Sequence, residues 1–286
     1  MVKLSDNDRA YAREFSEKID LSDTKTVLQY GYQAQKHVMD ISDRSLNDLP
    51  QHDYEEIIDD LTAMKKKITA FEKETMALSQ KMDTQKIFTA FKSACEHCSS
   101  AINETARRLE IHRSSLLRHH TRLEDHYDSI MKCIREYDMY IYAGELALKK
   151  GRTVNLADLL KRAEESGLKE DVLIANDYAQ SCTRMEKRLS DLSLSRQLPF
   201  QMCTQIRMMQ NTDIVIAENL RALCANAFPL WKNRMALVLG AGMERVIDPE
   251  VIKDTDEKLI QAADALIRTL SINRSKQKKG ILNIGN

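Results

Sequence analysis

One stretch decides the fold, residues 84–149: TQKIFTAFKSACEHCSSAINETARRLEIHRSSLLRHHTRLEDHYDSIMKCIREYDMYIYAGELALK. Residues 51–143 contain neither glycine nor proline, the two residues that most often interrupt a helix. Apolar residues recur in alternating steps of three and four, a spacing that keeps one stripe of a helix facing a partner helix. The pattern predicts one continuous helix of roughly 100 Å, given the rise per residue of an α-helix.

The apolar stripe of this helix changes register by one residue near His119 and His120. Its members are Phe88, Phe91, Cys95, Cys98, Ile102, Leu109, Leu116, Leu123, Tyr127, Ile130, Ile134, Tyr137, Ile141 and Leu148, with Thr105 and His112 as polar members. The preceding segment has a similar stripe, formed by Ile57, Leu61, Met64, Ile68, Phe71, Leu78 and Met82, with Thr75 as its polar member. Asp83 and Thr84 suit a turn and a helix N-cap. We therefore expect a helix of about 53–82 to fold back antiparallel on the helix of 84–149.

The rest of the chain also has helical periodicity and turn signals, and no stretch alternates like a strand. The expected helices begin at Ser5, run from Ser22 or Asp23 to about Ile41, and cover 156–166, 169–195, 200–227, the segment after Pro229, and 249 to about 271. We expect a loop at residues 42–52. Gly151 and Gly167 should each end a helix, and Leu198-Pro199 should separate two helices. The sequence thus predicts an all-α, elongated helical bundle with long antiparallel coiled-coil-like helices and no β-sheet. We expect a single domain over 1–272, with C-terminal helices at about 169–272, and a basic, disordered tail at 273–286.

Composition excludes several classes of protein. The 286 residues carry 43 Lys plus Arg and 43 Asp plus Glu, and this balance argues against a general nucleic-acid binder, which needs surplus cations. Residues 1–20 lack the apolar core of a signal peptide, and no apolar run is long enough to span a bilayer. The six cysteines then fit reduced thiols of a cytoplasmic protein.

Cys95 and Cys98 form a Cys-x-x-Cys pair, a spacing that can bind zinc or cycle as a disulfide. A zinc site needs two further ligands, and His112 and His119 lie too far along the same helix to supply them. Both cysteines also occupy positions of the apolar stripe. We interpret them as small apolar fillers and keep metal or redox use as the alternative.

A polar cluster interrupts the apolar pattern of the C-terminal helices. Arg207 and Lys232 could together hold an anion, whereas the competing interpretation is an internal polar network that fixes how helices pair. No Ser-His-Asp, HExxH or paired-carboxylate arrangement occurs, so we expect no catalytic residues, no cofactor and no metal. The cluster consists of Gln205, Arg207, Gln210, Asn211, Trp231 and Lys232.

Three segments resemble the TelA (toxic anion resistance) family. They are residues 27–36 (VLQYGYQAQK), residues 140–145 (YIYAGE), and Gln205-Ile206-Arg207 with Gln210-Asn211 followed by Pro229-Leu230-Trp231-Lys232. Their order and spacing also match, across about residues 27–240. Members of the family usually have a longer C-terminal helical region than this chain.

The resemblance implies a cytoplasmic bacterial protein of stress response, associated with resistance to tellurite and other toxic agents. It implies no enzyme activity and no catalytic residues. We therefore expect a non-enzymatic helical protein that acts through contacts with other proteins, including self-association through the long helix. The alternative is direct anion or metal binding by Arg207 and Lys232 or by Cys95 and Cys98.

Overall fold

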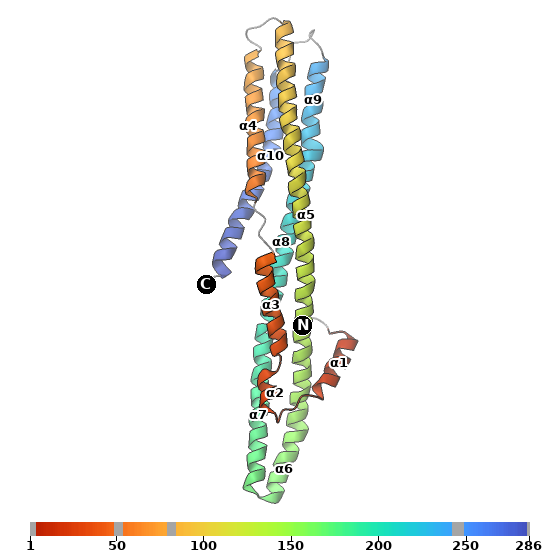
Figure 1. The fold of residues 1–286 in the computed structure, drawn as a ribbon, viewed down its shortest axis with the longest axis vertical. Helices are drawn as coiled ribbons and strands as arrows, with labels where there is room; N and C mark the ends of the chain where they lie inside the picture. Colours follow the sequence, from red (N-terminus) through yellow and green to blue (C-terminus); the bar gives the residue numbers. More distant parts are fainter. Residues whose placement is uncertain (1–3, 49–53, 79–83, 242–248, 285–286) are drawn as a thin grey trace. The chain divides into compact units, whose positions relative to one another are not determined.

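The computed structural model describes residues 4–48, 54–78, 84–241 and 249–284 (Figure 1). Every regular element within these ranges is a helix and none is a strand, so the predicted all-α class is confirmed. No helix of the described ranges combines the length and the apolarity that crossing a bilayer requires.

The α-helices are α1 (Asp6–Ser16), α2 (Thr24–Gln29), α3 (Tyr32–Asp48), α4 (Glu55–Leu78), α5 (Thr84–Lys150), α6 (Leu156–Ser166), α7 (Lys169–Ser195), α8 (Gln197–Ala222), α9 (Phe228–Gly240) and α10 (Pro249–Ile284). Two π-helical turns join neighbouring helices, η1 (Gly151–Asn155) and η2 (Leu223–Ala227). The predicted long helix is thus confirmed as α5, and the helix predicted at 169–195 is α7.

The chain forms two compact units. Unit 1 consists of Met1–Leu49 and Leu123–Met208, and unit 2 consists of Pro50–Arg122 and Met209–Asn286. Helices α5 and α8 each contribute residues to both units. A single domain over 1–272 stays a prediction.

The core of unit 2 is built from α4, the first part of α5, the end of α8, α9 and α10. The stripe predicted on α4 is buried from Ile57 to Phe71, and the stripe on α5 is buried at Phe91, Cys95, Cys98, Ile102, Leu109 and Leu116. Leu78 and Met82 lie outside the residues whose side chains are described. Asp60 of α4 pairs with Arg108 of α5 at 2.9 Å, and the Phe71 and Phe91 rings lie 6.1 Å apart. The partners run in opposite chain order, which confirms the antiparallel hairpin.

Unit 1 places α2, α3 and α7 against the second part of α5, and α6 folds back on α7 at Gly167 (Figure 1). The α5 stripe continues here as buried Leu123, Ile130, Ile134, Tyr137, Ile141 and Leu148. Gly167 ends α6 with φ of 63°, a left-handed conformation that glycine adopts without strain. The predicted stop at Gly167 is confirmed.

The segment predicted as one helix from residue 22 or 23 to about Ile41 is divided into α2 and α3. Asp23 caps α2 through hydrogen bonds from the backbone N–H groups of Lys25 and Thr26. Gly31 then turns the chain with φ of 71°, and a Cβ there would lie 2.5 Å from Leu192 Cδ1. The bend at Gly31 therefore lets α2 and α3 approach α7 closely.

Several predicted loops and ends are helical in the structure. Helix α3 continues to Asp48 through the segment expected to be a loop, and α8 begins at Gln197 because Pro199 falls in its first turn, where no backbone donor is needed. Helix α5 ends at Lys150, as predicted from Gly151, and the chain continues as the π turn η1; a Cβ on Gly151 would lie 2.5 Å from Leu21 Cδ1. Helix α10 extends to Ile284, past the end expected near Ser271 and through most of the tail expected to be disordered.

Candidate functional site

Trp231 of α9 is buried in unit 2 and fixes α9 to two neighbouring helices. Its indole Nε1 donates a hydrogen bond to Asp256 Oδ1 of α10 at 2.6 Å. Its ring lies 5.6 Å from the Phe71 ring of α4, in an edge-on arrangement. The sequence singled out Trp231 but not its partner, which lies in another helix.

Asp256 is a carboxyl group in the apolar core, with 0% of its surface exposed. Burial raises its pKa to about 7, the hydrogen bond from Trp231 acts in the opposite direction, and the Glu72 charge raises it further. Asp256 occupies an apolar stripe of α10 between Ile252 and Leu259. Asp256 could have been singled out from the sequence, because a carboxylate is unusual at a position where the apolar residues of a helix recur.

Cys95 and Cys98 of α5 are each only 4% exposed and belong to the same core. Burial, followed by the nearby charge of Asp256, raises the pKa of each thiol to about 12. Thiolate is the form that attacks electrophiles, so the raised pKa values make these thiols slow nucleophiles at neutral pH. Among the described residues, no three His, Cys, Asp or Glu side chains are placed to hold one metal ion.

Lys232 follows Trp231 on α9, and its Nζ donates to Asn103 Oδ1 of α5. The two residues line a groove of about 360 Å³ between α5 and α9, whose other lining residues include Cys95, Trp231 and Leu239. Lys232 therefore has a partner within unit 2.

Arg207 belongs to unit 1 and has different partners. Its guanidinium donates to Glu124 Oε2 of α5 at 2.7 Å and lies 3.7 Å from the centre of the Tyr127 ring. Arg207 and Lys232 are thus assigned to different units and contact different groups. A joint anion site stays a prediction. Each of the two cations contacts a residue of α5, so each links its own helix to α5.

The other members of the predicted polar cluster differ in exposure. Gln205 and Asn211 are exposed, whereas Gln210 is buried. One turn after Gln210, Asp213 Oδ2 lies 2.7 Å from His119 Nδ1 of α5, and the two side chains are 2% and 4% exposed. The sequence placed His119 near the register change of the stripe but did not indicate its partner Asp213.

Two of the motif segments meet in unit 1, at a set of contacts that we call the Tyr30 junction (Tyr30, Gln35, Tyr140, Gly144 and Arg188). The Tyr30 hydroxyl donates to the Tyr140 carbonyl at 2.6 Å, and Arg188 of α7 donates to the Tyr30 carbonyl and to Gln35 Oε1, both at 2.7 Å. A Cβ on Gly144 would lie 2.5 Å from Leu189 Cδ2 and 3.0 Å from Tyr30 Cε1. The segments 27–36 and 140–145 therefore fix how α2 and α3 pack on α5 and α7.

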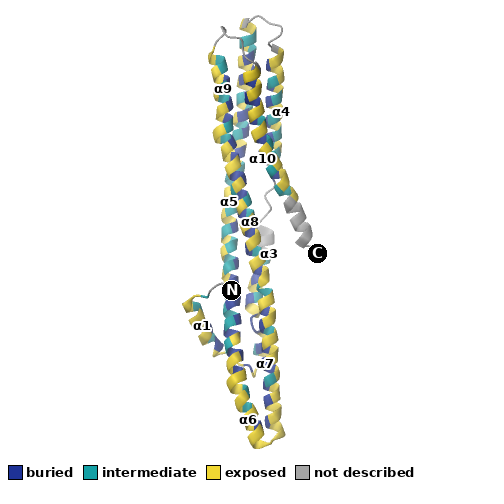
Figure 2. Ribbon diagram, turned by 180° about the vertical axis from the view of Figure 1, so that it is seen from behind, coloured by how far each residue is buried: buried dark blue, intermediate teal, exposed yellow. Residues whose placement is uncertain are grey.

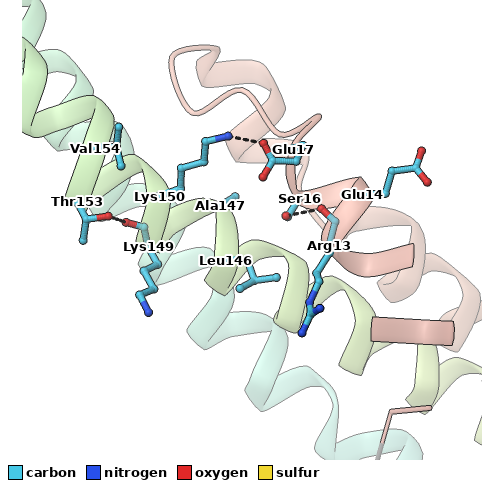
Figure 3. Close-up of a pocket in the computed structure, with 10 residues that line it drawn as sticks. All are labelled: Arg13, Glu14, Ser16, Glu17, Leu146, Ala147, Lys149, Lys150, Thr153 and Val154. Atoms are coloured by element: carbon cyan, nitrogen blue, oxygen red, sulfur yellow. Dashed lines mark hydrogen bonds and ion pairs between the residues drawn. The ribbon is translucent and has the colours of Figure 1, made fainter. Parts of the chain in front are cut away.

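A groove of about 560 Å³ lies between α1 and the end of α5 (Figure 3). Lys150 and Glu17 form an ion pair across it, while Leu146 and Ala147 contribute apolar lining. The close-up shows the Lys149 ammonium pointing away from this pair. The groove therefore does not gather its cations around one position.

Curated relatives align along nearly the whole chain. The uncharacterized protein Lmo1967 of Listeria monocytogenes is 28% identical, over 98% of this chain and 73% of its own length. The uncharacterized protein YaaN of Bacillus subtilis is 27% identical, over 98% of this chain and 76% of its own. The TelA-like protein SERP0976 of Staphylococcus epidermidis is 26% identical, over 99% and 78% respectively.

One solved structure aligns over 93% of this chain and 96% of its own, with a TM-score of 0.37 and 12% identity. It is the soluble AhlC triple head mutant of the tripartite alpha-pore forming toxin AHL from Aeromonas hydrophila, and a likeness this low supports no inference. By contrast, the sequence model of the toxic anion resistance protein (TelA) family matches residues 12–284. The chain belongs to the TelA family of toxic anion resistance proteins.

Proposed function

We propose that this protein is a non-enzymatic helical component of bacterial resistance to toxic anions such as tellurite, and that it acts in the cytoplasm by binding other proteins. The observation that carries the proposal is the set of exposed apolar side chains on the α6–α7 hairpin. These are Leu160, Leu168, Val172, Leu173 and Ile174, each 45–62% exposed. Groups of exposed apolar side chains mark protein interaction sites more often than ordinary surface does.

The contacts of the other candidate residues support the same proposal. Arg207 and Lys232, the cations expected to bind an anion, contact Glu124 and Asn103 instead. Cys95 and Cys98 are buried thiols with raised pKa values. These residues take part in contacts between helices, which favours the α6–α7 hairpin as the site of recognition.

The test is tellurite survival of a bacterium that lacks its own gene of this family and is complemented with variants of this chain. Leu160→Glu combined with Leu173→Glu places two charges on the hairpin at exposed positions, so folding should be retained. We expect survival to fall to that of the uncomplemented strain, together with loss of the crosslinked partner found with the wild-type chain. Circular dichroism of the purified variant checks its helix content.

Leu237→Glu is the matched control, because Leu237 of α9 is 73% exposed but lies in unit 2. It should support wild-type survival. The proposal fails if the hairpin variant, expressed at the wild-type level, protects cells as well as Leu237→Glu does.

Direct anion or metal binding is the competing proposal. It requires heat on titration with tellurite, or bound metal in purified protein, and either signal should be lost in Arg207→Met with Lys232→Met or in Cys95→Ser with Cys98→Ser. Titration calorimetry and metal analysis therefore separate the two proposals without reference to survival.

A further inference from the structure

Asp256 is an unusual residue for the position it occupies. It lies on the buried side of α10, surrounded by the core of unit 2, and none of its surface is exposed. Its Oδ1 accepts the hydrogen bond from Trp231 Nε1, while its Oδ2 has no hydrogen-bond partner among the described residues. A buried polar atom without a partner destabilises a fold, so its presence calls for an explanation.

Among the described residues, no cation acts on the pKa of Asp256, although Lys67 of α4 acts on the neighbouring Cys98 thiol. Helix α9 contributes the neutral indole of Trp231, α4 contributes the carboxylate of Glu72, and α5 contributes the thiols of Cys95 and Cys98. The nearest charges on α10 itself face outward and have other partners: Lys253 with Glu257, and Asp254 with Arg234 and Lys258. Apart from the hydrogen bond from Trp231, no described group that acts on Asp256 compensates a negative charge there, whereas a protonated carboxyl is neutral and suits the apolar core.

We infer that Asp256 acts as a proton-operated latch in the core of unit 2, where α10 meets α9. The core is more stable when the Asp256 carboxyl is protonated and less stable when it is charged, although the hydrogen bond from Trp231 is itself stronger to the charged form. The protonated group keeps Oδ1 as the acceptor for Trp231 and adds no charge to the core. Proton loss leaves a carboxylate with one hydrogen bond, next to Glu72 and two thiols. The helices that meet at Trp231 then pack around an uncompensated charge. This inference is independent of the proposed function.

The latch predicts a particular dependence of stability on pH. The pKa of Asp256 is raised from 3.8 to about 7 in the folded protein, so the folded state holds its proton more tightly than the unfolded state. The contribution of Asp256 to the stability of unit 2 is therefore greatest at low pH, falls as pH rises from about 4 to about 7, and levels off above that range. Between pH 5.5 and 8 the ratio of folded to unfolded unit 2 should fall about thirty-fold through this one group.

Urea unfolding of the full chain tests the latch, followed by the fluorescence of Trp231, which is the only tryptophan and lies in unit 2. Asp256→Asn keeps an acceptor oxygen for Trp231 but cannot ionise. We expect the wild-type chain to lose about thirty-fold in folding equilibrium relative to Asp256→Asn between pH 5.5 and 8. Asp254→Asn, which changes an exposed, ion-paired carboxylate two residues away, should keep the wild-type pH dependence.

A second measurement covers the case in which Asp256→Asn does not fold. Trp231 emission of the folded wild-type chain should titrate with a midpoint near pH 7, because the charge appears 2.6 Å from the indole nitrogen. Parallel pH dependence of Asp256→Asn and wild type, or Trp231 emission that does not change between pH 5.5 and 8.5, would overturn the inference.

Discussion

Asp138 in unit 1 and Asp256 in unit 2 are both buried carboxyl groups on long helices, but their surroundings differ. Asp138 Oδ1 lies 2.7 Å from Arg196 Nε, and Asp138 Oδ2 lies 3.0 Å from Arg196 Nη2, a two-point ion pair. Asp256 accepts one hydrogen bond from the neutral indole of Trp231. Buried positions recur along both α5 and α10 (Figure 2), and the two aspartates are 3% and 0% exposed, so burial alone does not distinguish them. The difference teaches that the partner, and not the depth of burial, decides whether the charge of a core carboxylate is compensated.

The largest expected effect comes from removing the charge of Asp138. Asp138→Asn leaves the Arg196 guanidinium without its carboxylate in a mostly buried position, and breaking such a pair costs about 3 kcal/mol. Asp256→Asn should have the opposite sign and stabilise unit 2 at pH 8. The melting temperatures of the two variants at pH 8 test this prediction. A shift of both melting temperatures in the same direction would contradict it.

A smaller effect is expected from Trp231→Phe, which removes the hydrogen bond to Asp256 and part of the buried ring. The loss should be about 2 kcal/mol, and it should be larger at pH 8 than at pH 5.5, because the N–H of Trp231 favours the ionised carboxyl. Circular dichroism melts at the two pH values measure it. Equal losses at both values would show that the bond does not depend on the protonation of Asp256.

The smallest effect concerns the thiols beside Asp256. Its charge adds to burial in raising the pKa of Cys95 and Cys98, so Asp256→Asn should speed their alkylation at pH 8.5 by roughly threefold. Cys203 of unit 1 is a matched control within the same sample, since burial raises its pKa but Asp256 does not contribute. Mass spectrometry of labelled peptides gives the three rates, and an equal change at Cys203 would indicate general loosening instead of a local charge effect.

Much of the fold could be predicted from the sequence because it follows from local periodicity. The stripe of α5 and the limits of α7 were visible as spacing of apolar residues, and Gly167 as a helix end. The extension of α3 to Asp48 was missed because a run of Ser, Asp and Asn reads as a loop, and tertiary context overrides such weak preferences. The π turn that follows α5 was missed because the spacing of apolar residues carries no signal for it.

The candidate site was predictable only in part. The sequence identified Trp231, Arg207 and Lys232, since rare or charged residues stand out in apolar helices. Their partners Asp256, Glu124 and Asn103 come from other helices, and heptad spacing alone does not specify which side chains meet across a bundle. The Tyr30 junction shows the same limit, because its motif segments lie about a hundred residues apart and meet through backbone and side-chain contacts.

The most direct test of the contrast between Asp138 and Asp256 is a pH titration of the Asp256 side-chain carboxyl carbon by 13C NMR, with its signal assigned by its loss in Asp256→Asn. An uncompensated buried carboxyl should titrate in the folded protein with a midpoint near 7. A midpoint near 4, the ordinary value for aspartate, would mean that Asp256 carries its charge at neutral pH and would contradict the account.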